Sequence, residues 1–174
     1  MIKAVLNIFI MFVYKLKYRN RVVVKSPSKS HILPKIRVER GGCISIDRAF
    51  MAEKNTSLES YTEGEIYIGS QVFMNSNVKV VAKKRITIGD NTVIGPNVCI
   101  YDHDHNWKSN DMQREFVEEE VRIGNNVWIG ANCVILRGTV IEDDSVIAAG
   151  SVVKGFIESS SLFYQKKENI VKKK

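Results

Sequence analysis

The chain has 174 residues, the length of a single domain, and 44% of them are hydrophobic, which is enough to form a core. A formal net charge of +7 and a pI of about 9.3 indicate an anionic partner, such as a phosphorylated cofactor, an acidic glycan, nucleic acid or a lipid surface. Three dispersed cysteines without a CxxC spacing exclude a disulfide framework and favour a reducing cytoplasm.

Residues 1–20 are expected to form a helix. Positions 4–13 are almost entirely apolar, and a basic flank follows over residues 14–21. The apolar stretch is too short for a bilayer, which needs about 20 residues, and no small-residue cleavage site follows it. Two interpretations stay open: the helix caps the first coil of a repeat structure, or it rests on anionic lipid.

An aliphatic residue returns at every sixth position in the second half of the chain. The unbroken run comprises Ile123, Ile129, Ile135, Ile141, Ile147 and Val153. Two earlier runs comprise Ile68, Met74 and Val80, and then Ile88, Ile94 and Ile100. Neither an α-helix nor a simple alternating strand has this period, whereas a parallel β-helix does. The expected fold is therefore an all-β solenoid whose short strands each point one aliphatic residue inward.

Each hexad is followed by a corner with recurrent residue types. Glycine follows the aliphatic residue at positions 89, 95, 124 and 130, and asparagine comes two residues later at 91, 97, 126 and 132. Glycine there indicates either positive φ or close approach of two backbones, and asparagine also tolerates the left-handed region.

The chain is thus expected to have three parts. Residues 1–36 form a helix followed by a linker over 21–36, residues 37–155 form the β-helix, and residues 156–174 form a basic tail. A protruding loop is expected at 101–122.

This loop, between Ile100 and Ile123, is the one long break in the hexads, and it begins with Asp102-His103-Asp104-His105. In an extended segment, the two histidines face one way and the two aspartates the other. Three interpretations are open. A histidine acts as general base, since an imidazole with a pKa near 6.5 accepts a proton at neutral pH; the cluster binds a metal; or the loop is a polar surface without chemistry.

The segments 123–135 and 140–153 resemble the hexapeptide-repeat acyltransferases, especially the maltose/galactoside O-acetyltransferase branch and the surface-polysaccharide O-acetyltransferases. The resemblance extends over about residues 44–155. It implies a left-handed parallel β-helix, and the handedness comes from the resemblance alone. It also implies a homotrimer with active sites at subunit interfaces, acetyl-CoA as co-substrate and no required metal.

The resemblance also implies roles for single residues. His105 matches the general base, with His103 as a secondary candidate. Expected to bind the acceptor are Asn75, Asp102 and Asp104. Expected to bind acetyl-CoA are Trp128, Ala131, Ala149 and Lys154. Corner packing for Asn75 and a subunit contact for Trp128 remain alternatives.

The implied reaction is direct transfer of an acetyl group to a hydroxyl of a sugar or surface polysaccharide (capsule, O-antigen or exopolysaccharide). The acceptor is free or lipid-linked, and the enzyme lies in the cytoplasm or peripherally on the inner face of the membrane. An antibiotic or another small molecule is the alternative acceptor. A γ-type carbonic anhydrase is a remote alternative, because its zinc needs three histidines and His31 lies before the first clear coil. The sequence has no stripe of aromatic and basic residues of the kind that would indicate nucleic acid binding.

Overall fold

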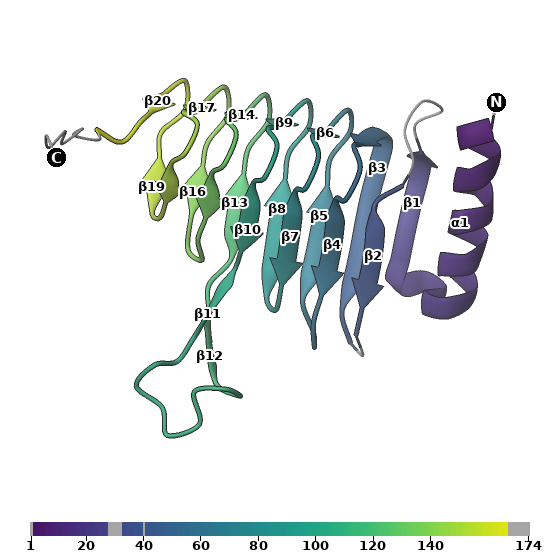
Figure 1. The fold of residues 1–174 in the computed structure, drawn as a ribbon, viewed down its shortest axis with the longest axis horizontal. Coiled ribbons are helices and arrows are strands. Elements are labelled where there is room, and N and C mark those ends of the chain that lie inside the picture. Colours follow the sequence, from purple (N-terminus) through teal and green to yellow (C-terminus); the bar gives the residue numbers. More distant parts are fainter. Residues whose placement is uncertain (1, 28–32, 40, 167–174) are drawn as a thin grey trace, which may run out of the picture.

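The computed structural model describes residues 2–27, 33–39 and 41–166 (Figure 1). Helix α1 (Ile2–Tyr18) and a short 3-10 turn, η1 (Arg19–Arg21), precede a left-handed parallel β-helix of about six turns. Almost every turn contributes one strand to each of three faces, and all pairings within these faces are parallel. The predicted solenoid is confirmed.

The first face contains β1 (Val22–Pro27), the start of β3 (Cys43–Ala52), β5 (Glu65–Ile68), β8 (Arg85–Ile88), β13 (Val121–Ile123), β16 (Val140–Ile141) and β19 (Phe156–Ile157). The second face contains the end of β3, β6 (Phe73–Met74), β9 (Val93–Ile94), β14 (Trp128–Ile129), β17 (Val146–Ile147) and β20 (Leu162–Phe163). The third face contains β2 (Lys35–Val38), β4 (Ser57–Ser60), β7 (Lys79–Ala82), β10 (Cys99–Tyr101), β15 (Val134–Ile135) and β18 (Val152–Val153).

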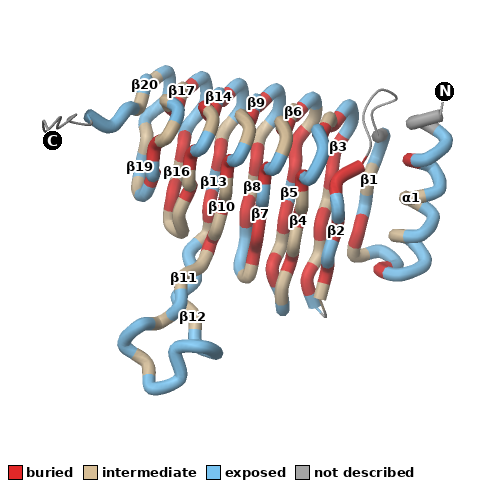
Figure 2. The backbone as a smooth tube through the Cα atoms, viewed as in Figure 1, coloured by how far each residue is buried: buried red, intermediate tan, exposed pale blue. Residues whose placement is uncertain are grey.

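The hexad residues form the core, as predicted. Every member of the three runs is buried, with at most 3% of its surface exposed. Figure 2 shows these buried positions recurring along the strands of successive turns, whereas the segment that protrudes from the solenoid is mostly exposed. Stacking one aliphatic side chain on its equivalents in neighbouring turns removes a continuous column of apolar surface from water, and this burial is the main stabilising contribution.

At the corners, positive φ and close approach of two backbones are met by different residue types, asparagine and glycine. The left-handed backbone belongs to the asparagines, which have φ of 59° at Asn97 and 58° at Asn132. Gly130 has no positive φ; instead, a Cβ at this position would lie 2.6 Å from the Ala149 nitrogen. Glycine is therefore needed for close stacking of the coils, and asparagine for turning the chain.

Helix α1 covers the first coil. The buried Asn7 side chain accepts a hydrogen bond from Leu33 N at 2.9 Å. Tyr14 Oη donates to Pro34 O at 3.1 Å, and Tyr18 Oη donates to Ile36 O at 3.2 Å. One side of the helix therefore caps the solenoid.

Two boundaries differ from the sequence prediction. Residues 21–36 are not simply a linker, because β1 and the start of β2 lie there; β1 pairs with β3 and sets Val22 beside Ile44. Residues 156–174 are not simply a tail, because β19 and β20 add a partial turn whose Ile157 and Phe163 pack on the core. The six-residue count missed both ends because a partial turn does not repeat. Residues 167–174 lie outside the described ranges.

Candidate active site

We name the corners by the faces they join. The second corner joins the second face to the third and includes residues 75–78, 95–98, 130–133 and 148–151. The third corner joins the third face back to the first, and it includes residues 83–84, 136–139 and 154–155. The loop predicted from the sequence projects from the third corner, where it comprises residues 102–120.

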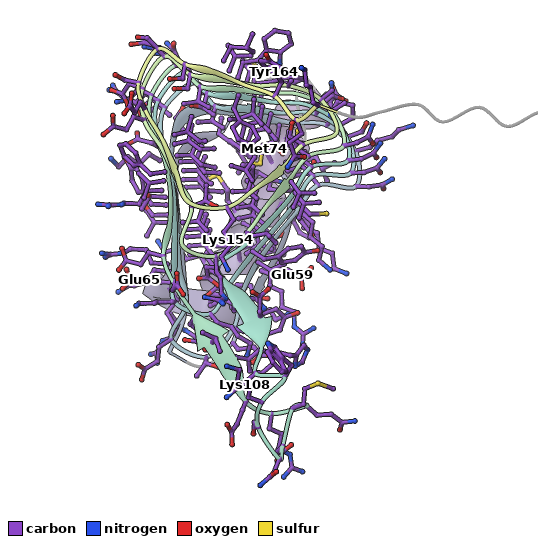
Figure 3. The ribbon with its side chains drawn as sticks, turned by 90° about the vertical axis from the view of Figure 1, so that its left-hand side faces the viewer. Glu59, Glu65, Met74, Lys108, Lys154 and Tyr164 are labelled. Atoms are coloured by element: carbon purple, nitrogen blue, oxygen red, sulfur yellow. The ribbon has the colours of Figure 1, made fainter. Side chains whose placement is uncertain are left out.

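The loop contains an antiparallel hairpin of β11 (His103–His105) and β12 (Phe116–Glu118), in which His105 pairs with Phe116. Figure 3 looks along the solenoid and shows the hairpin projecting from this one corner, with Lys108 near its outer end and Glu59 and Glu65 on either side of the corner. The hairpin thus holds its side chains outside the stack of coils.

A buried carboxylate anchors the base of the hairpin. Asp102 is fully buried, and its oxygens accept hydrogen bonds from Lys83 N at 2.9 Å and Lys84 N at 2.8 Å. The ring of His103 is also mostly buried, with Nδ1 2.9 Å from Asp102 Oδ1. Asp102 and His103 therefore fasten the hairpin to the coil below, an anchoring role that the sequence did not predict for Asp102.

His105 has a different environment. Its side chain is exposed, and Nδ1 lies 2.7 Å from the backbone oxygen of Met112. Because a carbonyl oxygen only accepts, Nδ1 carries the proton, and Nε2 of the neutral ring is left with a lone pair. His105 is thus held in the tautomer whose Nε2 can accept a proton.

The two histidine rings share one side of the hairpin, as the extended pattern predicted. Their centroids lie 5.6 Å (His103) and 4.6 Å (His105) from the Phe116 ring. The Lys83 ammonium sits 3.7 Å from the same ring centroid. This aromatic cluster fixes the direction of both imidazoles relative to the hairpin backbone.

Arg137 holds the opposite side of the hairpin. Its side chain is only 17% exposed, and Nε donates to Asp104 Oδ2 at 2.7 Å while Nη1 pairs with the Glu119 carboxylate. Asp104 belongs to β11 and Glu119 follows β12, so one guanidinium joins both strands to the next coil. Arg137 is not among the residues predicted from the sequence; the available signal was an arginine in the third corner of the turn that follows the loop.

Three of the four residues expected to bind acetyl-CoA lie near the second corner. Gly150 N donates to Ala131 O at 2.8 Å, and the backbone of Ala149 lies against Gly130. The successive coils therefore approach closely at this corner, where the side chains are small. Trp128 lies just before it on the second face and is 56% exposed. Lys154 is not with them, because it lies at the third corner.

Asn75 also lies at the second corner, where its Oδ1 accepts a hydrogen bond from Ser76 N at 2.7 Å. The third face therefore separates Asn75, Ala131 and Ala149 from His105. A face of about five residues is about 17 Å long, whereas a base must come within about 3 Å of the proton it removes. A single chain therefore does not bring Asn75, Ala131 and Ala149 to His105.

Within the described ranges, no three His, Cys, Asp or Glu side chains lie close enough to hold a metal ion. His31, which the zinc alternative would need, lies outside those ranges.

Three comparisons place this geometry among known proteins. A family model described as bacterial transferase hexapeptide (six repeats) matches residues 120–155. WbbJ of Escherichia coli K12, whose name assigns it to lipopolysaccharide biosynthesis as an O-acetyl transferase, is 28% identical over 90% of this chain and 81% of its own length. The galactoside O-acetyltransferase of the same strain is 44% identical over 39% of this chain and 34% of its own length.

The fold comparison gives the same result. The structure of a galactoside acetyltransferase in complex with coenzyme A matches 92% of this chain and 74% of its own, with 25% identity and a TM-score of 0.54. The family match covers residues 120–155, and over most of its length the chain is similar in sequence and in fold to hexapeptide-repeat acetyltransferases.

Proposed function

We propose that this acyltransferase moves an acetyl group from acetyl-CoA to a hydroxyl of a sugar or surface polysaccharide, with His105 as the general base. The observation that carries the proposal is the exposed imidazole whose Nδ1–H is held by the Met112 carbonyl at 2.7 Å. The relatives named as an O-acetyl transferase of lipopolysaccharide biosynthesis and as a galactoside O-acetyltransferase support the acceptor class.

The reaction is a direct transfer. Nε2 of His105 accepts the proton of the acceptor hydroxyl, and the oxygen attacks the thioester carbonyl carbon of acetyl-CoA. The tetrahedral intermediate carries its charge on the former carbonyl oxygen, where a backbone N–H stabilises it. The C–S bond then breaks, and the imidazolium returns the proton to the CoA thiolate. The products are the O-acetylated acceptor and free CoA.

The same proposal includes a homotrimer with its active sites between subunits. The hairpin at the third corner of one subunit would face the second corner of its neighbour, which carries Asn75, Ala131 and Ala149. This arrangement supplies the cofactor surface that is remote from His105 within one chain.

An apolar column on the second face supports self-association. Its outward residues stack in register along the solenoid and comprise Met51, Phe73, Val93, Trp128, Val146 and Leu162. Val93, Trp128 and Leu162 are each more than 40% exposed in the single chain. A contiguous exposed apolar surface of this kind marks a protein contact site. Trp128 can therefore serve both the subunit contact and the cofactor surface.

The test is release of CoA thiol from acetyl-CoA by His105→Ala, compared with the unaltered enzyme. Candidate acceptors are glycans, amino sugars and antibiotics, which separate the sugar proposal from a small-molecule one. Loss of a general base lowers the rate by about 10²–10⁴-fold. Sedimentation and CoA binding should be unchanged, because His105 is exposed and supports no core contact. Turnover close to normal in His105→Ala would reject the assignment.

We also propose that the reaction takes place in the cytoplasm, where the thiols of Cys43, Cys99 and Cys133 stay reduced.

A further inference from the structure

Helix α1 has a second face that the solenoid does not use. Asn7, Tyr14 and Tyr18 point to the coils, and with about 3.6 residues per turn the opposite side carries a different set. That set comprises Val5, Ile8, Phe9, Phe12 and Leu16, which are each between 58% and 68% exposed. A helix that is packed on one side and apolar on the other is suited to a second apolar environment.

Basic residues border this apolar face. Lys15 lies at one edge of the exposed stripe and Lys17 at the other, and both are exposed. No acidic residue precedes Glu39, whereas nine lysines and arginines do, which exceeds the net charge of +7 of the whole chain. The end of the molecule that carries α1 is therefore strongly cationic.

The apolar and cationic groups meet in a hollow at the C-terminal end of α1. The hollow has a volume of about 430 Å³ and is lined by Phe12, Lys15, Leu16, Arg19 and Asn20. A phosphate-bearing headgroup and the upper part of an acyl chain need these two kinds of lining side by side.

We propose that the exposed face of α1 binds the surface of a membrane that contains anionic phospholipid. No helix in the described part of the chain is long and apolar enough to cross a bilayer, so α1 would lie in the plane of the interface. Figure 1 shows α1 across one end of the solenoid, where no coil covers its outer side. The proposal is independent of the chemistry at His105.

Charge favours lipid over a second copy of the same face. Two α1 faces brought together would bring only basic charged side chains into one interface, including Lys15, Lys17 and Arg19 of both chains, with no acidic side chain on the helix to compensate. An anionic bilayer instead attracts each of these residues and accepts the apolar side chains between them.

The experiment measures cosedimentation of the full chain with two kinds of vesicle, phosphatidylcholine alone and phosphatidylcholine with one third phosphatidylglycerol. The unaltered protein should bind the anionic vesicles at least about tenfold more tightly, and less tightly as salt is raised. The triple variant Ile8→Ser, Phe9→Ser, Phe12→Ser should lose most of this binding. Lys15→Glu with Lys17→Glu should lose the preference for phosphatidylglycerol.

Phe156→Ser is the matched control, because Phe156 is similarly exposed, at 59%, and lies at the far end of the solenoid. It should bind vesicles as the unaltered protein does. Equal binding to both kinds of vesicle, or full binding by the triple variant, would overturn the proposal. A change in the lipid-free oligomeric mass of the triple variant would also overturn it, by assigning the face to another copy.

Thiol release with a free sugar acceptor is measured on the same variants. It should stay unchanged, so failure of lipid binding and failure of the acetyl transfer proposal give separate results.

Discussion

The third corner is built in two ways, and the two forms differ in what holds them in place. In most turns the corner takes two to four residues and returns the chain to the stack, as at 83–84 and 136–139. In one turn it takes residues 102–120, which project from the stack with few buried side chains. The short corners rest on aliphatic columns, whereas the long one is held by polar contacts at its base.

Those polar contacts are concentrated on two side chains. Asp102 binds the hairpin to the coil below through two backbone N–H groups, and Arg137 binds it to the coil above through two carboxylates. We therefore expect that a substitution in the solenoid core leaves these contacts in place, and that the hairpin can be loosened without unfolding the solenoid.

The largest effect on stability is expected from the aliphatic column. Ile68→Ala should lower the free energy of unfolding by about 2–5 kcal/mol, because it removes buried methyl groups and leaves a cavity. The adjacent outward residue Tyr67, 42% exposed, is the matched control, and Tyr67→Ala should cost far less. Chemical denaturation measures both, and equal losses would contradict an inward column.

A smaller loss of stability, with a large loss of hairpin order, is expected for Asp102→Ala. The substitution leaves the Lys83 and Lys84 N–H groups and the His103 ring without their acceptor, which costs about 1–3 kcal/mol. Hydrogen exchange should accelerate in β11 and β12 while the strands of the first face stay protected. Uniform acceleration across the solenoid would show that the hairpin is not a separate unit.

Arg137→Ala is expected to act on the reaction more than on the fold. Loss of the clamp to Asp104 and Glu119 should misplace His105, which lowers kcat by about 10–100-fold. KM for acetyl-CoA should change less than kcat, because the Arg137 guanidinium is already bound by the carboxylates of Asp104 and Glu119. Arg114→Ala, which alters an exposed arginine in the outer part of the loop, is the control and should leave both constants unchanged. A raised KM with normal kcat would assign Arg137 to cofactor binding instead.

The smallest effect is expected from the ion pair that ties β1 to β3. Lys25 Nζ lies 2.8 Å from Asp47 Oδ2, and this contact, followed by the Arg48 N–H, lowers the pKa of the Asp47 carboxyl. A lowered pKa means that the charged carboxylate stabilises the fold above its usual pKa of about 4, and that this contribution is lost as the pH falls through the lowered value.

The thermal midpoint of Asp47→Asn should therefore lie below that of the unaltered protein at pH 7, and the difference should shrink as the pH falls below about 4. A difference that is constant across this range would exclude the ion pair as its cause.

The sequence predicted the parts of the fold that repeat. Hexad residues such as Ile129 and Ile135 are buried as expected, since their environment recurs in every turn. The partial turns at β1 and at β19–β20 were missed, because a strand without repeats above and below it has no period. The fold could thus be predicted wherever neighbouring coils require a buried aliphatic residue at the same position.

The candidate site was predictable only for residues that the resemblance marks. His105 could be selected, but its tautomer depends on Met112 O, seven positions along the chain. Asp102 and Arg137 depend on partners in neighbouring coils, 18 to 33 positions away. No local pattern encodes such contacts, because they form only once the coils are stacked.

The number of coils between α1 and the hairpin has a consequence for the acceptor. On the first face β3, β5 and β8 lie between β1 and β13. With strands about 4.8 Å apart and a helix layer of about 10 Å beneath them, His105 would stand roughly 30 Å above a bilayer on which α1 rests. A single sugar on a lipid carrier would not reach that height, whereas a glycan several units long would. The solenoid would then act as a spacer that selects acceptors by their length.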